Sequence, residues 1–410
     1  MKQDNCIIIG ASHAAAELIP QLRQSGWEGH IQVIGDEDFL PYHRPSLSKD
    51  FLAGTKDADD LLIRHKRVYT KHDVELKLGH GVTSIDRAGH TVTLENDEVL
   101  GYTKLALCTG SRARQILLPG IELGGVHYLR SMADVMDIKR NVRNGGKAVI
   151  IGGGYIGLET AAVLTRLGMS VSVLEMLPRI LARVTAPELS EFFSRIHAEE
   201  GVDIQCDMAV EAIQGCSSGH VSRVVCADGK QFDAELVIVG AGIVPNVELA
   251  EAAGLEVDNG VLVDEFARTS DPDIVAAGDC TNHPNKPLGQ RLRLESVPNA
   301  TDQAKSAAAS ICGKQREYAQ IPWFWSDQYD VKLQIAGLNQ SYDQVVIRGD
   351  RSVGRGFVAY YLKEGKLLAA DCINRPEEFV VAKRLLAQDM EVSPDMLADE
   401  SVNPMDFLTP

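Results

Sequence analysis

A pattern of strand, glycine-rich turn, helix and strand occurs twice in this chain, and this duplication constrains the fold more than any other feature of the sequence. The first copy is CIIIGASHAAAELIPQL followed by IQVIGDE, and the second is AVIIGGGYIGLETAAVLTRLG followed by VSVLEM. Each copy ends its second apolar strand near an acidic residue. Such βαβ units bind nucleotides, so two copies predict two nucleotides bound face to face, one a hydride donor and the other an acceptor.

The second copy carries the stronger motif. Gly152, Gly154 and Gly157 follow a predicted strand and open a predicted helix, and Glu175 ends the next strand. The glycines allow a pyrophosphate to approach the helix N-terminus closely, and the acid can bind a ribose 2′-hydroxyl. Because a carboxylate at this point repels a 2′-phosphate, we predict NADH rather than NADPH.

The amino-terminal copy is weaker, since Gly10, Ser12 and Ala15 put a serine where the middle glycine of the motif is usual. The Ser12 side chain can donate to a phosphate oxygen or push the phosphate away, and the sequence leaves both open. His13, in the same turn, is expected to be a helix N-terminal contact rather than a catalyst.

The segments KLALCTGSRAR (104–114) and AELVIVGAGIVPN (234–246) both read as buried strands that end at a glycine, and they predict the two crossings into and out of an inserted domain. From about residue 318 the pattern becomes aromatic and alternating, which indicates an antiparallel sheet. The predicted fold class is therefore α/β, with two Rossmann-like nucleotide-binding domains of glutathione-reductase type and a C-terminal α+β domain. The predicted domains are 1–112 with 241–317, 113–240, and 318–410.

Composition excludes several classes of protein. A formal net charge of −16 argues against nucleic-acid binding, which needs clustered Lys and Arg. No apolar run is long enough to cross a bilayer, and the polar start leads directly into a strand, so a cytoplasmic location is expected. The eight cysteines form no C-x-x-C pair, so we expect neither a metal site nor a disulfide scaffold.

Two further features lie after the predicted return to the first domain. Asp279 follows a predicted buried strand; a lone Gly-Asp would be a solvated turn acid, but in this context we interpret it as an acceptor for a flavin ribityl hydroxyl. Pro298 suits the first position of an alanine-rich helix.

Taken in order, these segments resemble the FAD-dependent NADH:ferredoxin reductases that serve Rieske-type aromatic-ring dioxygenases and bacterial cytochromes P450. The resemblance runs over nearly the whole chain. Its most specific parts are LPYHRPSLSKDFL (40–52), GGGYIGLE (152–159), VGAGIVPN (239–246), AAGDC (276–280), RLRLESVPNATDQAK (291–305) and WFWSDQYDVKLQ (323–334).

The resemblance implies FAD in the first, discontinuous domain and NADH in the second. It places Asp36 as the ribose-binding acid, Arg44 and Arg130 at the pyrophosphate, and Lys49 near the reactive edge of the isoalloxazine. Together with the two motifs, it predicts FAD contacts from Gly10, Ser12, Ala14, Ala15, Asp36, Arg44, Lys49, Val82, Arg130, Asp279, Val297 and Trp325, and NADH contacts from Gly152, Gly154, Tyr155, Ile156, Gly157, Glu159, Glu175 and Gly242.

Catalytic roles are predicted for Lys49 and Glu159, which could pair, orient each other and loosen as nicotinamide enters; the alternative is a plain surface ion pair. The helix that begins near Pro298 is expected to direct its N-terminal N–H groups at the flavin N1 and O2 end. Trp323 and Trp325 fit either the core of the third domain or, for one of them, the flavin edge.

The implied activity is that of an NADH:ferredoxin oxidoreductase, which passes electrons singly from FAD to an acidic [2Fe–2S] ferredoxin. A rubredoxin reductase, an NADH oxidase or a redox-sensing protein like apoptosis-inducing factor are the alternatives, although no cysteine occurs at residues 40–45, where an oxidase would need one. We expect no nucleic-acid or membrane partner and a monomer or weak homodimer. The basic residues considered for ferredoxin docking are Arg291, Arg293, Lys332, Lys383 and Arg384.

Overall fold

The structure is a computed structural model that describes residues 4–408. It divides into two compact units. The first comprises the chain up to His43, Asp59–Arg112 and Val244–Trp323, and the second comprises Arg44–Ala58, Ala113–Ile243 and the chain from Phe324 onward. The stretches in which the chain passes between the units include β8 (Ser111–Ala113) and β17 (Ile243–Pro245).

The first unit is built on a parallel sheet of strand order β19-β7-β1-β2-β3. In register, Ile8 of the central strand lies between Val33 and Ala106. The inner strands β1, β7 and β19 are mostly apolar and buried, as in a sheet covered on both faces, whereas the edge strand β3 carries Glu75 and Lys77. Their bounds are β1 (Asn5–Ile9), β2 (His30–Gly35), β3 (Val74–Leu78), β7 (Lys104–Leu107) and β19 (Ile274–Ala276).

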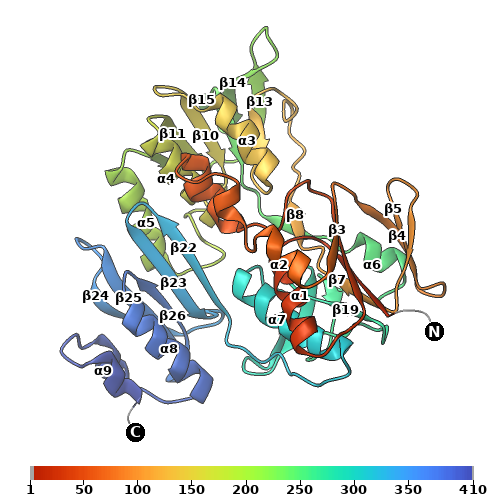
Figure 1. Cartoon of the computed structure of the whole chain (residues 1–410). Helices are drawn as coiled ribbons and strands as arrows, with labels where there is room; N and C mark the ends of the chain where they lie inside the picture. The colour runs from red at the N-terminus through yellow and green to blue at the C-terminus, as the bar shows by residue number, and fades with distance from the viewer. Residues whose placement is uncertain (1–3, 409–410) are drawn as a thin grey trace. The chain divides into compact units, whose positions relative to one another are not determined.

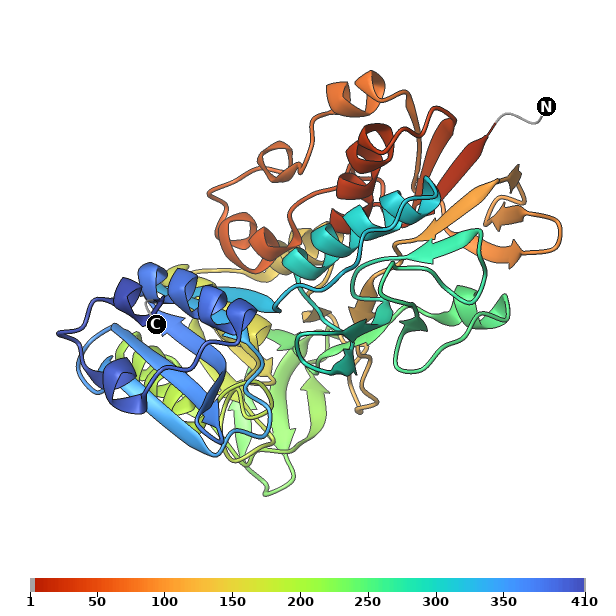
Figure 2. The same cartoon turned by 90° about the horizontal axis from the view of Figure 1, so that it is seen from below.

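Two alanine-rich helices, α1 (His13–Gln24) and α7 (Val297–Ile311), lie side by side on one face of this sheet, as both cartoon views show (Figures 1 and 2). Small side chains such as Ala15 and Ala304, both fully buried, let the helices approach closely. The unit also contains α2 (Lys66–Lys71), β4 (Val82–Asp86), β5 (Thr91–Leu94), β6 (Val99–Gly101), α6 (Glu248–Ala252), β18 (Val261–Leu262), β20 (Thr281–Asn285) and β21 (Gln290–Leu292).

The second unit contains another parallel sheet, of order β12-β11-β10-β16-β9. Its strands are β9 (Val126–Tyr128), β10 (Lys147–Ile151), β11 (Ser170–Leu174), β12 (Asp203–Gln205) and β16 (Leu236–Val239). The remaining elements of this part are α3 (Met132–Asn141), α4 (Tyr155–Arg166), α5 (Pro187–Glu199) and the small sheet β13 (Val210–Gly215), β14 (Val221–Cys226) and β15 (Gln231–Asp233).

The C-terminal part of the second unit is a sheet of order β22-β23-β26-β25-β24, antiparallel from β23 to β24. Figure 2 shows helix α8 (Pro376–Gln388), in blue, lying across it. The strands are β22 (Trp323–Gln328), β23 (Val331–Gly337), β24 (Gln344–Asp350), β25 (Gly356–Lys363) and β26 (Lys366–Ile373), and a short helix, α9 (Pro394–Ala398), follows α8. The predicted fold class, with two Rossmann-like sheets and a C-terminal antiparallel sheet, is confirmed.

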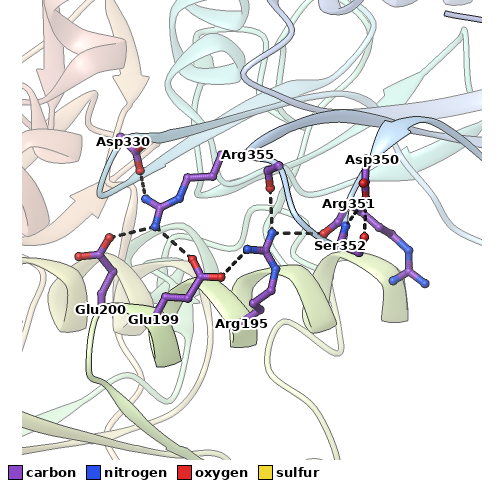
Figure 3. A network of polar contacts seen from close by, with 9 residues as sticks. Arg195, Glu199, Glu200, Asp330, Asp350, Arg351, Ser352 and Arg355 are labelled. Atoms are coloured by element: carbon purple, nitrogen blue, oxygen red, sulfur yellow. Dashed lines mark hydrogen bonds and ion pairs between the residues drawn. The ribbon is translucent and has the colours of Figure 1, made fainter.

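Helix α5 is fastened to the C-terminal sheet by charged and aromatic contacts. The Arg355 guanidinium lies between Asp330, Glu199 and Glu200, with the two glutamates at 3.2 and 3.1 Å (Figure 3). The rings of Phe192 and Phe357 meet edge to face with centroids 5.1 Å apart. These contacts join the predicted second and third domains, which explains why both fall within one compact unit. The three-domain division, with its boundary at 317/318, stays a prediction.

The segment Arg44–Ala58 belongs to the second unit, although the prediction includes it in the first domain. It contains the kinked segment Leu47–Phe51, in which Lys49 has non-helical backbone angles (φ −126°, ψ −111°). None of the helices described between residues 4 and 408 has the length and apolar character that crossing a bilayer requires.

Candidate nucleotide and hydride-transfer site

The glycine turn between β10 and α4 is shaped by close backbone contacts. Gly152 has φ +113°, and a Cβ there would lie 2.4 Å from the Gly240 carbonyl oxygen; a Cβ on Gly157 would lie 2.2 Å from the carbonyl oxygen of Gly152. A Cβ on Gly154, the residue that precedes the helix, would meet nothing within 4 Å. Two glycines thus serve internal packing, and the third leaves the helix N-terminus open to a pyrophosphate.

Glu175, directly after β11, is held beside this turn by backbone donors. Its Oε2 accepts a 2.7 Å hydrogen bond from the Gly153 amide, and its Oε1 accepts a 2.9 Å bond from the Leu177 amide. The carboxylate is therefore fixed in place before any ligand binds. This geometry fits the ribose hydroxyls of NADH and disfavours a 2′-phosphate.

Lys49 and Glu159 form the pair that the sequence analysis suggested. Lys49 Nζ lies 2.6 Å from Glu159 Oε2 and also donates to the Pro45 carbonyl at 3.1 Å. Glu159 is only 2% exposed. The alternative of a surface ion pair is therefore wrong, whereas the catalytic role of the pair stays a prediction.

Sequence reasoning missed two serines that complete the surroundings of Glu159. Ser48 donates to Oε2 at 2.6 Å, and Ser326 donates to Oε1 at 2.6 Å. Both serines lie within the segments that carry the family resemblance, but no spacing rule distinguishes a hydroxyl that reaches a carboxylate from an ordinary buried serine.

The predicted FAD turn in the first unit has the same construction as the NAD turn. Gly10 has φ +103°, and a Cβ there would lie 2.1 Å from the Cys108 carbonyl oxygen. Ser12 precedes α1, and its Oγ lies 3.4 Å from His13 Nδ1. The first turn of α1 carries no acidic residue, so a phosphate can approach its N–H groups without repulsion.

Asp279, at the carboxyl end of β19, accepts a 2.8 Å hydrogen bond from Ser111 Oγ. The bond fixes the orientation of the carboxylate, as an acceptor for a ribityl hydroxyl requires. At the start of α7 the Ser296 side chain accepts from the Asn299 amide at 3.2 Å, and Pro298 occupies the second position of the helix rather than the predicted first. The donor and acceptor set of the first unit therefore fits a flavin nucleotide.

The remaining predicted contacts are distributed over both units. In the second unit, Arg44 donates from Nη1 to the Arg130 carbonyl at 2.9 Å, so the two arginines predicted at the pyrophosphate adjoin. The Tyr155 ring packs 5.1 Å from that of Phe324, the neighbour of Trp325. The predicted site residues of the first unit are Gly10, Ser12, Ala14, Ala15, Asp36, Val82, Asp279 and Val297, and all others belong to the second unit.

Most of the cysteines are buried, whereas Cys216 is exposed. All eight are free within residues 4–408, and Cys108 and Cys280 are buried. Burial raises the pKa of both thiols, which disfavours a reactive thiolate.

Comparison with known families and proteins gives a consistent result. The model of the pyridine nucleotide-disulphide oxidoreductases matches residues 4–304, and that of the reductase C-terminal domain matches residues 323–408. The chain is 41% identical to putidaredoxin reductase of Pseudomonas putida, over 97% of this chain and 95% of the relative. It is 39% identical to the ferredoxin–NAD(+) reductase component of an anthranilate 1,2-dioxygenase system from Burkholderia cepacia, over the full length of both chains.

Among solved structures, the covalent complex of putidaredoxin reductase with putidaredoxin aligns with a TM-score of 0.96 and 40% identity, covering 99% of this chain and 98% of that chain. A ferredoxin reductase from Rhodopseudomonas palustris aligns with a TM-score of 0.95 and 39% identity, covering 98% and 99%. The chain belongs to the pyridine nucleotide-disulphide oxidoreductase family.

Proposed function

We propose that this protein is an NADH-dependent flavoprotein that accepts hydride on FAD and passes the electrons singly to a small [2Fe–2S] ferredoxin, which feeds a dioxygenase or a P450. The observation that carries the proposal is the similarity, over nearly the whole chain, to reductases whose names specify ferredoxins. We also propose that the protein acts in the cytoplasm.

The cofactors are assigned to the two glycine turns. The turn at Gly10, with Asp36 and Asp279, would hold FAD, and the turn at Gly152 with Glu175 would hold NADH. When bound, FAD supplies the chemistry that couples a two-electron hydride donor to one-electron acceptors.

The residues of this chain then have positioning and electrostatic roles. Glu159 holds the Lys49 ammonium in one orientation, and Ser48 prevents Oε2 from turning away. The N-terminus of α7, at Val297, carries the positive end of the helix dipole, which stabilises negative charge that develops nearby. Each contribution is non-covalent: the ion pair orients a charge, and the helix terminus favours negative charge near it.

The test is NADH-driven reduction of cytochrome c with and without an added [2Fe–2S] ferredoxin. We expect a yellow protein that releases free FAD on denaturation, prefers NADH, and reduces cytochrome c rapidly only with ferredoxin. Recovery of FMN, or of no flavin from a folded preparation, contradicts the cofactor assignment. Rapid oxygen consumption that ferredoxin does not change would indicate an NADH oxidase instead.

A rubredoxin is the second acceptor to compare, because the chain is also 37% identical to a rubredoxin–NAD(+) reductase of Pseudomonas putida, over 90% of this chain and 96% of the relative. Both acceptors are assayed at equal concentration. A higher kcat/KM with rubredoxin would favour this candidate.

Docking of an acidic ferredoxin can be tested with a matched pair of lysines. Lys332 has a side chain 59% exposed, 3.8 Å from Asp327, and Lys230 has one 55% exposed, 3.7 Å from Asp228. Lys332→Glu should lower the association rate with ferredoxin about threefold to tenfold at low salt, and less at high salt. Lys230→Glu makes the same change of charge and should leave the association rate with ferredoxin unchanged. Equal effects of both variants would place docking elsewhere, and direct reduction of ferricyanide should stay constant in both.

A further inference from the structure

A line of buried polar side chains leads from Glu159 into the interior of the second unit. Ser326 Oγ donates to Glu159 Oε1 at 2.6 Å, and Gln328 Nε2 donates to Ser326 Oγ at 3.2 Å. Gln328 Oε1 lies 2.8 Å from His197 Nε2, and His197 Nδ1 lies 3.1 Å from the Tyr329 hydroxyl. Ser326, Gln328 and His197 are at most 1% exposed.

The chemistry of each group fixes the direction of these hydrogen bonds. The single Ser326 proton goes to the carboxylate, which accepts, so Ser326 must itself accept from the Gln328 amide nitrogen. The amide oxygen then faces His197 Nε2, which must carry a proton. His197 Nδ1 is left to accept from Tyr329, so each bond of the line pairs a donor with an acceptor.

This arrangement requires a neutral imidazole, and the surroundings favour one. Burial lowers the pKa of His197 to about 4, an effect larger than the opposing hydrogen bond to Gln328 and the charge of Glu200. The opposite orientation of the Gln328 amide would place its oxygen against Ser326 Oγ. The Ser326 hydroxyl would then no longer be directed to Glu159. The line therefore has one low-energy arrangement at neutral pH.

We propose that Ser326, Gln328, His197 and Tyr329 are positioning residues that fix the plane of the Glu159 carboxylate and, through it, the Lys49 ammonium during hydride transfer. Ser48 and Lys49 hold one carboxylate oxygen, and Ser326 holds the other, so rotation of the carboxylate breaks three hydrogen bonds. The inference rests on the proposed function, because it assigns the pair to the NADH half-reaction.

Attachment of α5 to the C-terminal sheet does not rest on this line alone, although the His197–Gln328 hydrogen bond is part of it. The aromatic contact of Phe192 with Phe357 and the ion pairs of Arg355 make that connection separately (Figure 3). Loss of a hydroxyl from the line should therefore leave the fold in place while freeing Glu159.

The experiment is stopped-flow reduction of the bound flavin by NADH, with no ferredoxin present. Ser326→Ala should lower the limiting reduction rate about tenfold to hundredfold, as loss of one hydrogen bond to a charged group predicts, with little change in the Kd for NADH. Ser326→Thr, which keeps the hydroxyl, should restore most of the rate. In a Glu159→Ala background, Ser326→Ala should have no further effect.

Ser306→Ala is the matched control, because Ser306 is also 1% exposed but its hydroxyl has no hydrogen-bond partner. It should reduce at the wild-type rate. If Ser326→Ala does not fold, Tyr329→Phe tests the far end of the line and should slow reduction by a smaller factor that also disappears without Glu159.

The outcomes separate this inference from the proposed function. A wild-type protein whose flavin NADH does not reduce contradicts the proposed function. Three results overturn the positioning line alone, provided that NADH reduces the wild-type flavin normally. Ser326→Ala could reduce at the wild-type rate, Ser326→Thr could fail to restore the rate, or Ser326→Ala could slow reduction equally in the Glu159→Ala background.

Discussion

Lys49 and Glu159, 110 residues apart in the sequence, form an ion pair of 2.6 Å in which the carboxylate is 2% exposed. Removing one partner of a buried pair leaves the other without a counter-charge, a larger loss than at a surface pair. The orientation of each charged group in the pair therefore depends strongly on the other.

Lys49→Ala should slow reduction of the flavin by NADH about tenfold to hundredfold, since a hydrogen bond to a charged group contributes about 1.5–3 kcal/mol. It should also lower stability more than Glu159→Gln, which leaves no buried anion. Stopped-flow reduction and urea unfolding of both variants measure these effects. Unchanged reduction in both would show that the pair has a structural role only.

Glu175→Ala should narrow the preference for NADH over NADPH by about tenfold or more in kcat/KM, because it removes both the ribose acceptor and the charge that repels a 2′-phosphate. Most of the change should come from a higher KM for NADH. Steady-state kinetics with both coenzymes check this prediction. A wild type that uses them equally would contradict the assignment of Glu175.

Gly152→Ala and Gly154→Ala should separate folding from binding. A Cβ at position 152 would lie 2.4 Å from a backbone oxygen, so this variant should lose about 2 kcal/mol or more of stability. A Cβ at position 154 meets no protein atom within 4 Å, so that variant should melt like the wild type but bind NADH several-fold more weakly. Thermal melting and NADH titration distinguish the two, and identical behaviour would refute the assigned roles.

Acid should destabilise the protein partly through His197, whose pKa is lowered to about 4 from an ordinary value of 6.5. Between pH 6.5 and 4, the His197 imidazole is protonated in the unfolded chain but stays neutral in the folded protein. The free energy of unfolding therefore falls as pH falls from 6.5 to 4. The loss is on the order of 3 kcal/mol at pH 4, and it is absent above pH 6.5. Urea unfolding of His197→Gln should depend less on pH in this window.

Asp371 provides a control of opposite sign. Burial raises its pKa from 3.8 to about 6 despite hydrogen bonds from Tyr361 and Thr185. The folded protein therefore keeps a proton that the unfolded chain releases, and this contribution to stability is lost as pH rises from 3.8 to 6. Asp371→Asn should steepen the acid destabilisation that His197→Gln flattens; the same shift in both variants would contradict this account.

Much of the architecture could be predicted from local patterns. The glycine turns at Gly10 and Gly152, each between an apolar strand and an alanine-rich helix, predict both parallel sheets, because backbone packing permits no larger residue there. The alternating residues after 318 predict the antiparallel sheet for a similar reason, since period two places one face inward. The position of Glu175 beside the glycine turn could be predicted because it ends the strand of a known motif, and its role toward NADH stays a prediction.

Tertiary structure alone decided which polar groups meet. Ser326 is 167 residues from Glu159, and His197 is 131 residues from Gln328, so no periodicity relates them. Hydrogen-bonded partners are selected by distance and direction within a packed interior, and a serine or glutamine has the same local signal whether or not it reaches a carboxylate. The sequence determined the sheets and the nucleotide turns through local backbone constraints, whereas only the tertiary structure brought Ser48, Lys49 and Ser326 to Glu159.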